Sequence, residues 1–65
     1  MNYGQEILGE RAKNRINQVE LSEAVGISRP TLVDIENDRI GIDEPTYNRI
    51  IDCINEIAAK STAAA

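Results

Sequence analysis

The chain has 65 residues, a formal net charge of −4 and no His, Trp or Phe. This length allows one domain, close to the lower size limit for a single core, and that core must be aliphatic. Because the sequence offers no His, no paired nucleophile and base and no cluster of metal ligands, we expect no enzyme activity, cofactor or metal site.

Two further absences narrow the class of protein. No apolar run approaches the roughly 18 residues that a membrane span needs, and the first residues lack the basic-then-apolar pattern of a signal peptide. We therefore expect a cytoplasmic protein without a membrane partner. The single cysteine, Cys53, has no second thiol, so it is expected to be a reduced, half-buried side chain.

Helical spacing of apolar residues predicts a first helix that ends at about Asn14, with Asn2 and Gln5 as its capping box. Its apolar positions are Tyr3, Ile7, Leu8 and Ala12. Asn17 and Glu20 form a second capping box, which begins a second helix. The inward positions of this helix are Leu21, Ala24 and Val25, and Gly26 suits its left-handed end.

The start of a third helix has two interpretations. Ser28 is a natural N-cap, but Pro30 prefers the first helical position and disfavours helical geometry in the residue before it. Arg29 is therefore the alternative cap. Within this helix, Leu32 and Ile35 are expected to face inward.

A loop over residues 38–42 leads to a fourth helix, capped by Asp43 or Glu44 and with Pro45 in its first turn. Its apolar face comprises Tyr47, Ile50, Ile51, Ile54, Ile57 and Ala58. We expect the domain to span residues 1–60 and the tail, residues 61–65, to fray.

The segment from Asn17 to Asn37 has the pattern of a helix-turn-helix, in which the second helix enters the DNA major groove. From Leu8 to about Ile57 the chain resembles the Cro and phage-repressor (Xre) type helix-turn-helix family. The matching residues are Gln18, Leu21, Val25-Gly26-Ile27-Ser28, Thr31-Leu32 and Ile35-Glu36-Asn37. The resemblance implies an all-α, lambda-repressor-like domain of four helices, or five as the alternative, whose partner is a double-stranded DNA operator.

The resemblance also implies roles for single residues. Gln18 would donate to a phosphate and brace the recognition helix, and Asn37 falls where family members touch another phosphate. Arg29, Pro30 and Asp34 fall where members touch base edges. A further matching pair, Arg11 and Glu36, would link the first helix to the end of the third.

The chemistry of the residues fits several of these roles. Arg29 can present a bidentate fork to guanine, and Asp34 can accept from cytosine N4. Val33 can pack on a thymine methyl group, and Thr31 can touch a thymine methyl group or a phosphate. The candidate DNA-binding residues are Gln18, Ser28, Arg29, Pro30, Thr31, Val33, Asp34, Asn37 and Arg39.

The sequence departs from the family pattern after the third helix. Asp38 stands where a glycine is common, so a left-handed turn there is less comfortable. The loop from Arg39 to Glu44 carries one basic and two acidic residues. We therefore expect few phosphate contacts and a shallow salt dependence of DNA binding.

Two isoleucines in one short loop also need an explanation. They either cap the small core or join the fourth helix in a homodimer interface, which two-fold operators favour. The candidate dimerisation residues are Ile40, Ile42, Ile51 and Ile54.

These observations predict a sequence-specific transcriptional regulator, a dimeric repressor of a phage, plasmid or bacterial operon. Helix 3 would read palindromic half-sites in the major groove, and no small-molecule effector is expected. The alternative is a protein-interaction module, or an antitoxin-like partner protein, on the same fold with weak or no DNA binding. The acidic net charge motivates this alternative, because DNA-binding domains are usually basic.

Overall fold

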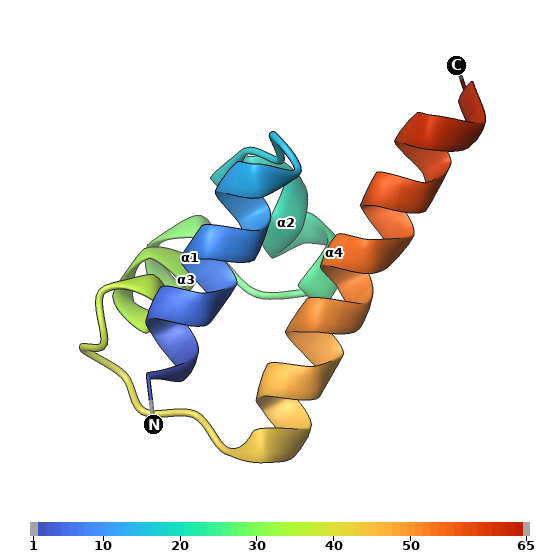
Figure 1. Cartoon of the computed structure of the whole chain (residues 1–65). Coiled ribbons are helices and arrows are strands. Elements are labelled where there is room, and N and C mark those ends of the chain that lie inside the picture. Colours follow the sequence, from blue (N-terminus) through green and yellow to red (C-terminus); the bar gives the residue numbers. More distant parts are fainter. Residues whose placement is uncertain (1, 65) are drawn as a thin grey trace.

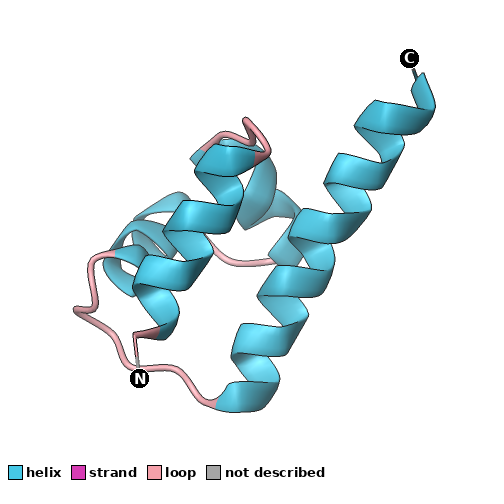
Figure 2. Cartoon of the chain, viewed as in Figure 1, coloured by secondary structure: helices cyan, strands magenta, loops and turns pink. Residues whose placement is uncertain are grey.

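A computed structural model describes the backbone of residues 2–64 and the side chains of residues 2–60. In this part of the chain the regular elements are four helices (Figures 1 and 2). They are α1 (Tyr3–Lys13), α2 (Gln18–Val25), α3 (Arg29–Glu36) and α4 (Glu44–Ala64). The all-α, four-helix prediction is confirmed, and the alternative fifth helix does not occur within residues 2–64. The predicted division into a domain and a frayed tail stays a prediction.

The core lies where the four helices meet, and it is aliphatic as predicted. Its fully or nearly fully buried apolar side chains are Ile7, Ile16, Leu21, Val25, Leu32, Ile35, Ile50 and Ile54. Tyr3 and Tyr47 stack on one another, with ring centroids 4.5 Å apart, and join α1 to α4. One expected inward position, Ala24, is wrong, because its side chain is exposed; Ala12, an apolar position of the first helix, is exposed as well. Ile16, which precedes α2, supplies buried volume that helical spacing did not predict.

Local capping explains where three helices begin. The side chain of Asn17 accepts from Glu20 N at 2.7 Å, and that of Ser28 accepts from Thr31 N at 3.3 Å. Asp43 accepts from Thr46 N at 3.0 Å, and hydrogen bonds from the hydroxyl and then the backbone N–H of Thr46 hold the pKa of Asp43 below its ordinary value. Each cap satisfies a backbone N–H that has no partner inside its helix.

One of the two interpretations of the start of α3 is confirmed, and the capping prediction for α1 is wrong. Ser28, not Arg29, caps α3, because Ser28 is extended and Arg29 is already helical, which places Pro30 at the second helical position. A backbone N–H at this position would have no acceptor within the helix, so the absence of that N–H in proline costs no helical hydrogen bond. Asn2 makes no side-chain cap for α1. Its amide instead faces the carboxylate of Asp38, with the amide nitrogen 2.9 Å from an oxygen.

The turns between the helices use left-handed backbone at three places. Gly26 ends α2 with φ +88°, as predicted. Arg15 and Asp38 are the non-glycine residues with positive φ, at +59° and +61°. Asp38 thus adopts the left-handed turn that the family pattern gives to glycine.

The fourth helix packs along α1 and α2, and its C-terminal end projects beyond the other helices (Figure 1). In its second turn, Arg49 Nη2 donates to Val25 O at 2.8 Å. One turn later Cys53 Sγ donates to Ala24 O at 3.7 Å. The thiol is half-buried as predicted, and burial raises its pKa. Among the described residues, no helix has the combination of length and apolar character required to cross a membrane.

The close approach of α1 to the end of α3 requires glycine at position 4. A Cβ atom on Gly4 would collide with Ile35 O and lie 2.7 Å from Asp38 Oδ1, whereas a Cβ on Gly9 would meet nothing. We expect Gly4→Ala to lower the free energy of unfolding by about 1–3 kcal/mol through overpacking. The control, Gly9→Ala in the same helix, should raise it by up to about 1 kcal/mol because alanine favours helix.

Thermal or urea unfolding followed by circular dichroism measures both effects. Equal stabilisation by the two alanines would contradict the packing of α1 on α3.

Candidate nucleic-acid interface

Helix α3 has one buried side and one side that is exposed or half-buried. Leu32, Ile35 and Glu36 are buried, while Arg29 and Pro30 are exposed. Val33 and Asp34 are half-buried one turn further along. The last four share one side of the helix, since residues four apart lie above one another. Together they line a surface hollow of about 330 Å³.

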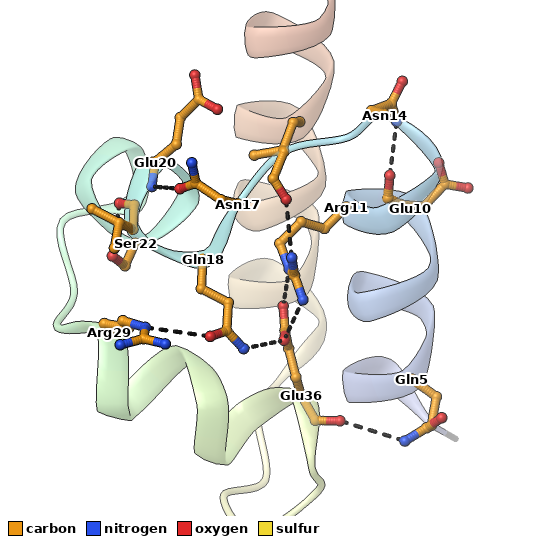
Figure 3. Close-up of polar contacts among 12 residues, drawn as sticks. Gln5, Glu10, Arg11, Asn14, Asn17, Gln18, Glu20, Ser22, Arg29 and Glu36 are labelled. Carbon is orange, nitrogen blue, oxygen red and sulfur yellow. Dashed lines mark hydrogen bonds and ion pairs between the residues drawn. The ribbon is translucent and has the colours of Figure 1, made fainter.

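A chain of polar contacts runs from α1 through α3 and α2 to this exposed side (Figure 3). Arg11 donates two hydrogen bonds to the Glu36 carboxylate, from Nε to Oε2 at 2.6 Å and from Nη2 to Oε1 at 3.0 Å. Gln18 Nε2 donates to the same carboxylate at 3.2 Å, and Arg29 Nε donates to Gln18 Oε1 at 3.4 Å. The terminal amino groups of Arg29 are therefore left to the outer face.

The side chains at the centre of this series of polar contacts are buried or nearly so. The side chain of Glu36 is 1% exposed and that of Arg11 is 16% exposed. Arg11 Nη1 also donates to Ile16 O at 2.9 Å, which ties the pair to the turn before α2. The expected link between the first helix and the end of the third is confirmed.

Other predicted DNA-binding residues lie around the same end of the molecule. Ser28 and Thr31 are occupied with each other, since their hydroxyl oxygens are 2.8 Å apart and Ser28 also caps α3. Asn37 and Arg39 follow α3 and are exposed. Arg39 Nη1 lies 3.6 Å from Asp34 Oδ1. This ion pair offsets part of the negative charge that Asp34 would bring towards phosphates.

The four candidate dimerisation residues do not share one environment. Ile40 is 41% exposed, and Ile42 and Ile51 are half-buried against the core. Ile54 is 0% exposed within a single chain, so its side chain has no surface to offer to a second copy. Its assignment to a dimer interface is corrected. The helical spacing that placed Ile54 beside Ile51 could not tell the core side of α4 from its outer side.

One contact close to the turn between α2 and α3 has no signal in the sequence. Arg49 of α4 binds the backbone carbonyl of Val25, just before the Gly26 turn that leads into α3. Arg49 and Val25 are far apart in sequence, and a backbone acceptor leaves no trace in residue types. In the described part of the chain no group of His, Cys, Asp and Glu could hold a metal ion.

Comparison with known proteins assigns the chain to a family. A model of the helix-turn-helix family matches residues 9–55, which includes all of α2 and α3 and most of the rest of the chain. Searches of curated proteins and of solved structures give no significant match.

Because Glu36 is buried, we expect removal of its partner to be costly. Arg11→Met should lower the free energy of unfolding by about 3–5 kcal/mol, which is the typical cost of an uncompensated buried charge. The double variant Arg11→Met, Glu36→Leu should recover much of that loss, since it buries no charge. Urea unfolding measures both.

The exposed pair supplies the control. Arg39→Met breaks the pair between Arg39 and Asp34, whose side chains are 71% and 39% exposed, so it should cost at most about 1 kcal/mol. A similar cost for Arg11→Met and Arg39→Met would contradict the buried role of Glu36.

Proposed function

The chain belongs to the Cro and phage-repressor (Xre) type helix-turn-helix family of DNA-binding regulators, and we propose that it is a homodimeric transcriptional repressor. In this proposal α3 enters the major groove and each copy reads one half-site of a palindromic operator. The observation that carries it is the outer side of α3, which presents Arg29, Pro30, Val33 and Asp34. Arg29 is hydrogen-bonded to Gln18, and Leu32 and Ile35 pack the opposite side of the helix into the core.

Arg29 is the proposed principal base reader. Its Nε atom is held by Gln18, so its two terminal amino groups can form the bidentate fork to guanine O6 and N7. Gln18 and Asn37 would contact phosphates, and Arg39 would add a cationic contact. Few cations lie on this face, so attraction to phosphates would contribute little to binding. Selectivity would come from the contacts with base edges.

The homodimer would form through the side of the molecule that carries Ile40 and the outer side of α4, including Ile51. Ile40 supports this proposal, since it is one of two large hydrophobic side chains that the described residues leave well exposed, the other being Val19. Ile42 lines the same surface hollow as Ile40. Ile51 is partly buried against the core and would add its exposed part to the contact. A dimer would double the number of base contacts, which a single short recognition helix limits.

The second candidate is a protein-interaction module without strong DNA binding. The net charge of −4 and the exposed Asp43 and Glu44 after α3 favour it. Two results together would support this function instead: capture of a stoichiometric protein partner, and an affinity for DNA that changes with neither salt concentration nor DNA sequence.

The first test is operator selection followed by titration. Sequences enriched from a random DNA pool should contain two inverted half-sites, and the protein should prefer them to random DNA. Arg29→Ala should weaken binding by roughly 5- to 150-fold for each half-site, the value of one bidentate base contact. Lys60→Ala removes the same charge near the far end of α4 and should change affinity little. Equal, weak affinity for selected and random DNA would exclude the proposed repressor.

The second test concerns the dimer. Ile40→Glu places a charge on the proposed contact and should convert the dimer to a monomer in analytical ultracentrifugation without loss of helical content. Val19→Glu changes the other exposed hydrophobic residue, on α2, and should leave the dimer intact. A dimer that survives Ile40→Glu, or a wild-type chain that stays monomeric on its operator, would contradict the proposal.

A further inference from the structure

The hollow on α3 combines three chemical features. Its lining combines the apolar side chains of Pro30 and Val33 with the cationic side chain of Arg29 and the carboxylate-bearing side chain of Asp34. Val33 and Asp34 are only half-exposed, so the groups that a base would meet are partly shielded from water. A base edge that fits this surface must offer a hydrogen-bond donor next to an apolar group.

Asp34 keeps the capacity to accept from a base while it is paired with Arg39. The contact with Arg39 uses Oδ1 at 3.6 Å, and an ionised carboxylate has acceptor sites on both oxygens. Cytosine presents the N4 amino donor in the major groove, and thymine presents O4, an acceptor, in its place. The carboxylate therefore favours a base with an amino donor, cytosine or adenine, over thymine. Only cytosine has an apolar C5 edge beside that donor, because adenine presents the N7 acceptor there.

Among the four standard DNA bases, thymine carries a methyl group at C5, but its O4 acceptor would face the carboxylate of Asp34 unfavourably. In cytosine, C5 is the ring atom next to the carbon that bears N4, so a substituent at C5 points to the surface beside the hydrogen-bonded amino group. On α3 that surface is formed by Pro30 and Val33. A methyl group seated there would lose contact with water.

We propose that this hollow reads 5-methylcytosine: Asp34 accepts from N4 while Pro30 and Val33 cover the C5 methyl group of the same base. The inference rests on the proposed function, because it assumes that α3 lies in the major groove. It adds the chemical class of the base and names Val33 as the residue that senses the methyl group. Methylation of the operator would then strengthen binding.

The experiment uses the full chain and the selected operator, with the half-site base pair made as cytosine·guanine, 5-methylcytosine·guanine or thymine·adenine and every other base pair unchanged. Burial of one methyl group should tighten binding by about 4-fold for each half-site. Thymine should weaken it by roughly 5-fold or more for each half-site, the usual cost of one mismatched pair. Asp34→Asn, whose amide can donate to O4, should remove the preference for cytosine over thymine.

Val33→Ala should lose most of the gain from methylation, measured as the ratio of its own affinities for methylated and unmethylated operator. Val19→Ala, an exposed valine on α2, is the matched control and should keep that gain. Circular dichroism confirms that both variants fold.

The outcomes separate the two proposals. If no sequence is enriched from the random pool, the repressor function fails and this inference fails with it. If an operator is found but its half-site lacks cytosine, or methylation leaves affinity unchanged or weaker, the inference alone is overturned. Retention of the methylation gain by Val33→Ala would also overturn it.

Discussion

The carboxylate of Glu36 is the point on which the arrangement of the helices depends. It is almost completely buried, and donors from α1 and α2 converge on it. A carboxylate in such a place is tolerated only when it is paired and its oxygens are hydrogen-bonded. Satisfying it therefore requires α1, α2 and α3 to adopt their native positions together, which links a charge inside the molecule to the position of Arg29 on its surface.

The same contacts reconcile an acidic chain with a DNA-binding family. Net charge describes the mean field around a protein, whereas binding depends on where the charges lie. Glu36 is neutralised internally by Arg11, and Asp34 is paired with Arg39. Two of the acidic groups nearest the proposed DNA-binding face therefore contribute less repulsion than their formal charges suggest. The acidity of the chain is compatible with selective, weakly salt-dependent DNA recognition.

Features encoded by neighbouring residues could be predicted from the sequence. The caps at Asn17, Ser28 and Asp43 and the left-handed Gly26 follow from local chemistry, and the outer side of α3 follows from helical spacing. Features that depend on the approach of distant segments could not. Ala24 is exposed although its spacing matches the core, and Ile54 is buried although it belongs to the same apolar face as Ile51.

The site shows the same division. The pairing of Arg11 with Glu36 was expected from the family resemblance, but the bridging position of Gln18 between Glu36 and Arg29 required the structure. Residue types indicated which side chains could contact DNA. They did not indicate which of those side chains also hold one another, because that depends on the angle between α2 and α3.

The contacts that α4 makes with the end of α2 have a consequence for how the molecule opens. Arg49 and Cys53 supply donors to Val25 O and Ala24 O, in the last turn of α2, where carbonyls lack partners within the helix. If α4 detaches, these carbonyls lose their protein donors and the core loses Ile50 and Ile54 in the same event. Helix α3, which packs on α2 and on the same core, therefore has little access to a partly unfolded state of its own. Exchange of its amide hydrogens should follow global unfolding rather than local fraying.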